Sequence, residues 1–227
     1  MKWKFYVLVM AAVLAGASAS AQGSRSIIKQ QIGEWGSCRS AALTLTGGDL
    51  VLNGFNDYAC PDVPENLAVT LSQLRARGDY LDDVQLTEEG RWLILYGDNG
   101  VLWNDIPQEL EQTLREYNEA QEIITSVAFN DAGDWIVVSK SRYAASSPSL
   151  TRWIAEGIDE YGALWTAHMT EDGTVLCFEN GYLWRGNVPG IVQQKLRETT
   201  LDAYRVKFLS DGTYFIADQE GQCEYYL

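Results

Sequence analysis

The chain has 227 residues, and its 31 Asp and Glu residues outnumber 17 Lys and Arg residues, which gives a formal net charge of −14. A surface this acidic repels phosphate backbones, so we expect no nucleic-acid partner. The length suffices for one sizeable core, and all-β domains of this size are often single.

The first segment is predicted to lie outside the fold. Lys2 and Lys4 precede an apolar run over residues 5–14, and Ala-Ser-Ala at residues 19–21 fits a cleavage site. This pattern predicts a secretory signal peptide over residues 1–21. The apolar run is shorter than the roughly 20 residues that span a bilayer, although an uncleaved anchor is the alternative. We therefore expect export, to the periplasm or the extracellular space, with no membrane span in the mature chain.

The mature chain, residues 22–227, is predicted to be a single repeat domain. Residues 22–37 precede the first unit and are expected to supply a strand or a cap. Four prolines then recur at intervals of 43, 41 and 41 residues: Pro64, Pro107, Pro148 and Pro189. A turn glycine lies upstream of each, and a fifth follows: Gly48, Gly90, Gly133, Gly173 and Gly212. A period near 40 residues indicates a propeller, a solenoid or an array.

The second unit shows the pattern most clearly. Val84 and Leu86 alternate with polar residues, as in a half-buried strand, and an acidic turn ends at Gly90. A dense apolar run over residues 92–96 indicates a strand buried on both faces. An Asn-Gly turn then leads to a third strand that carries Trp103.

Each proline is predicted to begin a helix, because it fixes φ and lacks an N–H group. Leu67, Leu71 and Leu74 then share one helix face, and the later units repeat this spacing. The units are therefore β-β-β-α, over about 38–80, 81–123, 124–163, 164–203 and 204–227. We predict a mainly β fold with helices, in which five repeats form a β-propeller-like ring, because radial closure hides sheet edges. An open repeat spiral is the alternative.

The second unit resembles a known bacterial repeat. Residues 84–97 and 99–107 resemble "V-x-F-x-x-x-G-x-W-x-V-x-x-G" followed by "N-G-x-x-W-x-x-x-I-P" and a helix. This repeat belongs to a group of largely uncharacterised propeller-like proteins, and the resemblance covers residues 41–227. The third unit departs from it over residues 139–147, which lack the Asn-Gly turn and the second Trp. The resemblance implies a fold and no particular activity.

The sequence contains no recognisable catalytic set. His168 is the single histidine, and its strand slot holds unrelated residues in the other units, so we interpret it as a partly exposed structural residue. The acidic turns are expected to gather on one rim, where turn chemistry explains them and a cation or a basic partner is an alternative. No zinc spacing and no calcium loop is present, so we expect no metal and no cofactor.

Aromatic residues are the candidate ligand-binding residues. Trp92 and Trp135 share a slot with other apolar residues, which favours the core. Trp103 and Trp184 end third strands near an edge, where they are expected to stack on a sugar or a peptide. Tyr58 and Tyr182 are further candidates.

Four cysteines in an exported chain predict two disulfides. The expected pairing is Cys38 with Cys60 and Cys177 with Cys223. A bond between Cys38 and Cys223, which would staple the two chain ends, is the alternative.

These patterns favour a secreted, non-enzymatic binding or scaffold module that recognises a protein or a glycan. A carboxylate-based glycan hydrolase of propeller-like fold is the alternative, and it requires two carboxylates facing each other across a cleft. A purely structural exported protein is a third possibility.

Overall fold

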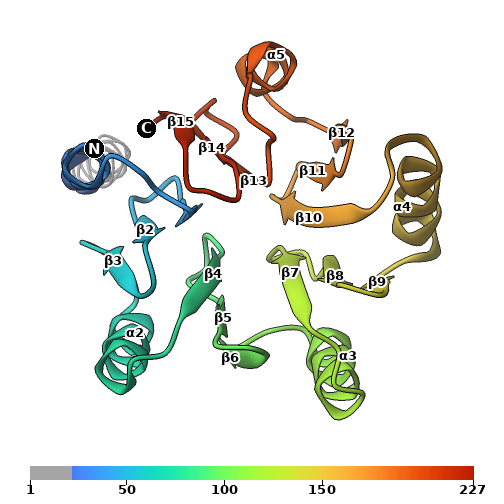
Figure 1. The fold of residues 1–227 in the computed structure, drawn as a ribbon, viewed down its shortest axis with the longest axis horizontal. Helices are drawn as coiled ribbons and strands as arrows, with labels where there is room; N and C mark the ends of the chain where they lie inside the picture. Colours follow the sequence, from blue (N-terminus) through green and yellow to red (C-terminus); the bar gives the residue numbers. More distant parts are fainter. Residues whose placement is uncertain (1–21) are drawn as a thin grey trace, which may run out of the picture.

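The computed structural model describes residues 22–227, and the predicted signal peptide over residues 1–21 lies outside the described residues. Five three-stranded antiparallel sheets stand around a common axis, with helices on the outside (Figure 1). The prediction of a mainly β, propeller-like fold built from five β-β-β(-α) units is confirmed.

Each sheet is built from three consecutive strands that pair in chain order. The first strands lie nearest the axis (Figure 1): β1 (Ser40–Ala42), β4 (Leu81–Leu86), β7 (Ile124–Phe129), β10 (Leu164–Met169) and β13 (Arg205–Phe208). The middle strands are β2 (Leu50–Asn53), β5 (Trp92–Tyr96), β8 (Trp135–Ser139), β11 (Gly173–Phe178) and β14 (Tyr214–Ala217). The outer strands are β3 (Asp57–Ala59), β6 (Gly100–Asn104), β9 (Tyr143–Ala145), β12 (Gly181–Gly186) and β15 (Cys223–Tyr226). Four of the first strands begin within one residue of a predicted unit boundary.

The turns between first and middle strands show the repeat at atomic detail. Four turn glycines have φ between 80° and 93°, a left-handed conformation that favours glycine: Gly47, Gly90, Gly133 and Gly212. The prediction of Gly48 in the first unit was wrong by one residue, because Gly48 donates its N–H to the Thr44 hydroxyl instead. Gly173 also departs from the prediction, because its φ does not lie in the left-handed region. The fourth turn is one residue shorter, and Thr170 N–H donates to Gly173 O at 2.8 Å.

Four helices follow outer strands and begin at the predicted prolines. They are α2 (Glu65–Arg77), α3 (Gln108–Glu119), α4 (Pro148–Tyr161) and α5 (Gly190–Glu198). Three prolines immediately precede their helices with φ from −50° to −55°, and Pro148 is the first residue of α4. Ser147 caps α4 by accepting a hydrogen bond from Leu150 N–H at 3.3 Å.

Each helix fills the gap between two neighbouring sheets. Leu67, Leu71 and Leu74 of α2 are buried between the first sheet and the second. The other helices repeat this arrangement, so the interior consists of five hydrophobic clusters, one per gap. The apolar interior is therefore divided between gaps, and burial of each cluster requires two adjacent units.

The fifth gap is filled from the other end of the chain. Residues 22–35 form a helix, and of the two alternatives that the sequence left open, a strand or a cap, the strand is wrong. Ile28 and Ile32 of this helix are buried in one cluster with Phe215 and Leu227 of the last unit and Val51 of the first. The ring therefore closes by packing, while every strand ladder stays within its own unit. Within the described chain, no helix is long and apolar enough to cross a bilayer.

Candidate functional site

The ring has two faces with different chemistry. The turns between first and middle strands form one, which we call the acidic-turn face: residues 44–48, 87–91, 130–134, 170–173 and 209–213. The turns between middle and outer strands form the other, which we call the hairpin face: residues 54–56, 97–99, 140–142, 179–180 and 218–222. Because the strands are antiparallel, each first strand begins at the hairpin face.

Carboxylates of the acidic-turn face hold neighbouring units together. Glu88 accepts a hydrogen bond from Leu45 N–H at 2.7 Å, and burial raises the pKa of the Glu88 carboxyl. Asp131 accepts from the Thr87 hydroxyl at 2.6 Å. Glu171 in turn accepts from Asp131 N–H, also at 2.6 Å. The acidic turns thus reach from one unit to the preceding one, so these carboxylates have a structural role.

A buried polar cluster fills the axis. Asp83 contacts Arg205 at 3.2 Å and Lys207 at 3.3 Å, and Ser40 and Gln85 donate hydrogen bonds to the same carboxylate. All five residues are at most 5% exposed. Burial alone would raise the pKa of Asp83, but the two cations and the hydrogen bonds lower it below its usual value. The cluster joins the second and fifth units through buried charge pairs, and the first unit through the hydrogen bond that Ser40 donates to Asp83.

His168 lies at the edge of this axial cluster. Its Nε2 is 3.1 Å from Phe208 O, and its ring meets the Phe208 ring edge-on at 5.1 Å. Burial and the nearby Lys207 lower the pKa of His168 to about 3, so the imidazole is neutral at pH 7. Among the described residues no nucleophile or carboxylate hydrogen-bonds to it, so the geometry assigns it no catalytic partner.

The predicted aromatic residues all lie on outer strands, in three different units: Tyr58 on β3, Trp103 on β6, and Tyr182 and Trp184 on β12. Three of these rings are each covered by an arginine from the helix that follows in the chain. The guanidinium-to-centroid distances are 5.6 Å for Arg75 on Tyr58, 5.4 Å for Arg115 on Trp103 and 5.0 Å for Arg197 on Trp184. Tyr182 and Trp184 stack at 5.8 Å. The structure therefore brings only this last pair together, and of the four only Tyr182 lines a cavity described below.

The four cysteines are free thiols in the structure. Cys38 lies in the fifth gap, whereas Cys60 packs in the gap between the first and second units. Cys177 lies between the fourth and fifth units, in a different cluster from Cys223. The expected pairing of Cys38 with Cys60 and Cys177 with Cys223 was therefore wrong, because the members of each pair pack into different gaps.

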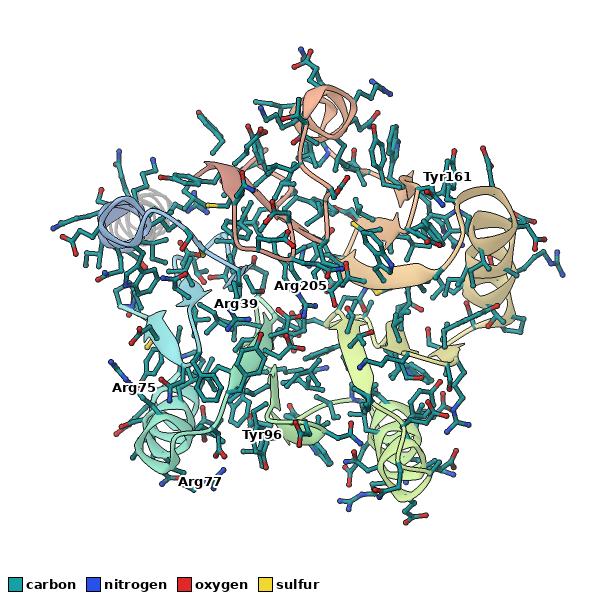
Figure 2. All side chains as sticks on the ribbon, viewed as in Figure 1. Arg39, Arg75, Arg77, Tyr96, Tyr161 and Arg205 are labelled. Carbon is teal, nitrogen blue, oxygen red and sulfur yellow. The ribbon has the colours of Figure 1, made fainter. Side chains whose placement is uncertain are left out.

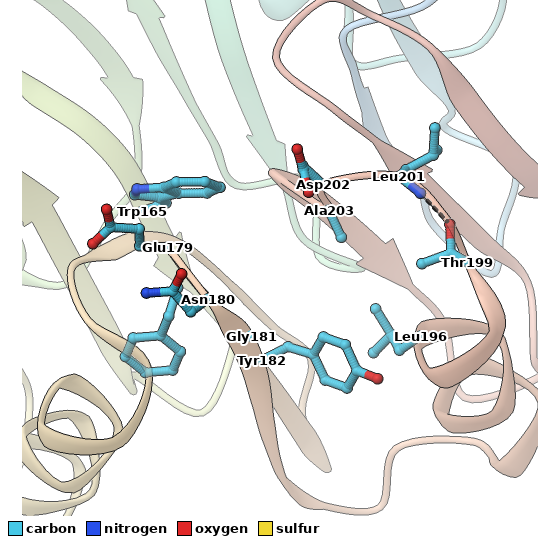
Figure 3. A pocket seen from close by; sticks show the side chains of 11 residues that line it. Trp165, Glu179, Asn180, Gly181, Tyr182, Leu196, Thr199, Leu201, Asp202 and Ala203 are labelled. Atoms are coloured by element: carbon cyan, nitrogen blue, oxygen red, sulfur yellow. Dashed lines mark hydrogen bonds between the residues drawn. The ribbon is translucent and has the colours of Figure 1, made fainter.

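A cleft of about 340 Å³ opens between the fourth and fifth units at the hairpin face. We call it the lateral cleft. Figure 3 shows Trp165 and Glu179 on one side, Asp202 and Leu196 on the other, and Tyr182 at its base. Asn180 adds an amide group to the lining. The cleft thus combines three aromatic rings, those of Trp165, Phe178 and Tyr182, with carboxylate and amide groups.

A second cavity of about 170 Å³ lies at the axis on the same face. We call it the axial pocket. Arg39 and Arg205 approach it near the centre of the ring (Figure 2). Arg39 donates to the Tyr80 hydroxyl at 2.7 Å and stacks on that ring at 4.6 Å. Asp82 pairs with Arg205 at 3.3 Å, and burial raises the pKa of the Asp82 carboxyl.

An aromatic pair joins the two cavities. Trp165 lines the lateral cleft and Tyr204 lines the axial pocket, and their ring centroids are 5.9 Å apart. The ladder between β10 and β11 shifts register beside Trp165, and the second and third units shift at the equivalent place. Such bulges re-aim side chains, which accounts for the position of Trp165 at the cleft.

No protein-family model matches the chain, and no curated protein matches it. The described part of the chain also contains no group of three or more His, Cys, Asp or Glu side chains arranged to hold a metal ion.

Proposed function

We propose that this chain is an exported binding module that holds a carbohydrate in the lateral cleft of the hairpin face. One observation carries the proposal. Trp165 and Tyr182 share a cavity of about 340 Å³ with Glu179, Asn180 and Asp202. A volume of this order falls within the roughly 300–1,000 Å³ range of small-molecule sites.

The lining of the cleft suits a sugar ring. The apolar C–H face of a sugar stacks on indole and phenol rings, which bury a large area while their polar edges remain wet. Sugar hydroxyls donate hydrogen bonds to carboxylate and amide oxygens, which Glu179, Asn180 and Asp202 supply. Because the charged groups of the lining are acidic, the favoured ligands are neutral or amino sugars, and acidic sugars are disfavoured.

Export is part of this proposal. The n-region, the apolar run and the small residues before position 22 support a cleaved signal peptide. The formal net charge of −14 keeps such a protein soluble and apart from other acidic surfaces. A carbohydrate ligand fits this location, because glycans are abundant outside the cytoplasm.

Binding is favoured over hydrolysis by the state of the carboxylates. A glycosidase needs one carboxyl group that stays protonated near neutral pH, and burial is the usual means of raising its pKa. Glu179 and Asp202 are both exposed in the lateral cleft. Asp83 is buried, but its cationic partners hold its pKa low. Burial raises the pKa of Asp82, but this carboxyl pairs with Arg205 in the axial pocket and is not part of the lining of the lateral cleft. The carboxylates at the cleft are therefore suited to accept hydrogen bonds from a bound ligand.

A glycan array followed by calorimetry tests the proposal. The wild-type chain is screened first, and the best oligosaccharide is then titrated into Trp165→Ala, Tyr182→Ala and Trp103→Ala variants. Loss of one stacking ring is expected to weaken binding about tenfold, which corresponds to about 1.4 kcal/mol. Trp103→Ala is the matched control, because this ring lies under Arg115 in another unit.

An array without any bound glycan would contradict the proposal. So would a Trp165→Ala variant that binds as tightly as the wild type. Release of reducing ends from the bound oligosaccharide would favour the hydrolase alternative instead.

A further inference from the structure

The junction between the last unit and the first differs from the other four. At those junctions the chain runs from one unit through a helix into the next, so the two sheets are covalently continuous. At the fifth gap, the helix over residues 22–35 is joined only to the first unit, and it meets the last unit through side-chain packing. This junction is therefore held by non-covalent contacts without a chain connection between the two sheets.

Two cysteines lie at this junction, one from each side. Cys38 begins the first unit and Cys223 begins β15 of the last. Both belong to the cluster that includes Ile28 and Phe215. Cys38 is fully buried, and Cys223 is partly buried.

Their backbones approach within hydrogen-bonding distance. Cys38 N–H donates to Gly221 O at 2.8 Å, and Gly221 is two residues from Cys223. The Cys223 thiol itself lies against the backbone N–H of Cys38. Burial raises the pKa of the Cys223 thiol, and the hydrogen bond from Cys38 N–H offsets part of that rise. Disulfides span Cα atoms about 4.4–6.8 Å apart, a separation compatible with chains that are hydrogen-bonded in this way.

We propose that Cys38 and Cys223 form a modification site, at which a disulfide joins the last unit to the first and locks the ring. The physiological part of the inference rests on the proposed export, because exported compartments are oxidising. Cys60 and Cys177 lie in other gaps and remain thiols. The chain thus carries one bond and two unpaired cysteines.

The chemistry is thiol–disulfide exchange with a glutathione disulfide or the disulfide of an oxidoreductase. The Cys223 thiolate, which is the more accessible, attacks one sulfur of the oxidant and releases one thiol. The Cys38 thiolate then attacks the mixed disulfide and releases the second thiol. The oxidant gains two electrons, and the protons lost by the two cysteines end on its thiols. Because Cys38 is buried in the folded ring, the second step belongs to folding, before the helix over residues 22–35 has docked.

Refolding of the purified chain in a glutathione redox buffer tests the cysteine geometry without depending on export. The refolded protein is alkylated without reduction, digested and analysed by mass spectrometry. The expected result is a cross-linked peptide that contains Cys38 and Cys223, with Cys60 and Cys177 alkylated. Cys38→Ser and Cys223→Ser each abolish the cross-link, whereas the matched controls Cys60→Ser and Cys177→Ser keep it.

A thermal readout distinguishes this bond from a chance cross-link. Reduction is expected to lower the unfolding midpoint of the wild type and of Cys60→Ser, and to leave that of Cys38→Ser unchanged. Full alkylation of all four thiols after oxidative refolding would overturn the proposal, as would any cross-link through Cys60 or Cys177. The two parts of the inference can fail separately. If the bond forms on refolding but cells retain the chain in a reducing compartment, export is refuted and the pairing of the two cysteines still holds.

Discussion

His168 is expected to make a pH-dependent contribution to stability, which substitution of this one residue removes. The pKa of the folded-state imidazole is lowered to about 3 by burial and by Lys207, against about 6.5 in an unfolded chain. Between these two values the unfolded state binds the proton and the folded state does not. The stabilisation is therefore fully present above pH 6.5 and is lost as the pH falls toward 3.

The magnitude follows from the width of this window. Each pH unit inside it is worth about 1.4 kcal/mol, so lowering the pH from 6.5 to 4.5 removes about 2–3 kcal/mol from the free energy of unfolding. His168→Gln removes the titrating group and keeps a side chain that donates to Phe208 O. Glutamine already occupies the corresponding place on β4, as Gln85.

Urea unfolding of the wild type and His168→Gln at pH 7.5, 6.5, 5.5 and 4.5 measures this difference. Carboxylates shared by both proteins titrate equally, so the difference between the two curves isolates His168. The wild type is expected to lose about 2–3 kcal/mol more than the variant over this range. Parallel curves would refute the assignment of a neutral imidazole at pH 7, as would an NMR titration midpoint near 6.5 in the folded protein.

Three further substitutions test the contacts that hold the ring, each by its urea midpoint. Asp83→Asn leaves two buried cations without their carboxylate and is expected to cost about 3–5 kcal/mol; a cost below 1 kcal/mol would show that solvent reaches the axis. Glu171→Ala removes the acceptor for the preceding turn and costs about 1 kcal/mol, whereas the neighbouring Asp172→Ala stays within about 0.5 kcal/mol. Ile28→Ala costs about 2–4 kcal/mol and the exposed Ile27→Ala is nearly neutral; equal effects would contradict docking of this helix in the fifth gap.

The repeat was predictable from sequence because its signals are local. Prolines at a fixed interval, glycine turns and leucines at helical spacing depend on backbone conformation and on one buried face, which the residue types and their spacing reveal. The first unit was misaligned at its turn because adjacent glycines, Gly47 and Gly48, both fit the pattern, and only the backbone φ separates them.

The helix over residues 22–35 was missed because the two units that it packs between lie at opposite ends of the chain. Ile28, Ile32 and Trp35 follow helical spacing, and this signal was present in the sequence. Its meaning depends on a gap that exists only after the ring has formed. The local spacing indicates a helix, but it does not reveal which distant segments the helix packs against.

The axial cluster and the lateral cleft were not predictable for a related reason. Alternation on a strand was interpreted as one buried and one solvated face, whereas the inner edge of a ring is buried on both sides. Asp83 and Arg205 are therefore buried although they occupy polar positions in the pattern. Trp165 gave no signal, because the equivalent positions of the second and third units hold Asp82 and Thr125. Tyr182 was the one predicted residue that the structure places in the lateral cleft.

Closure of the ring by the helix over residues 22–35 is the feature on which the hairpin face and the proposed disulfide both depend. Methyl-labelled NMR of the reduced protein tests it most directly. Nuclear Overhauser contacts are expected from Ile28 or Ile32 to Phe215 or Leu227, which share one buried cluster. Contacts from these isoleucines to the first unit, such as Val51, with none to the last unit, would show an open spiral and contradict the closed ring.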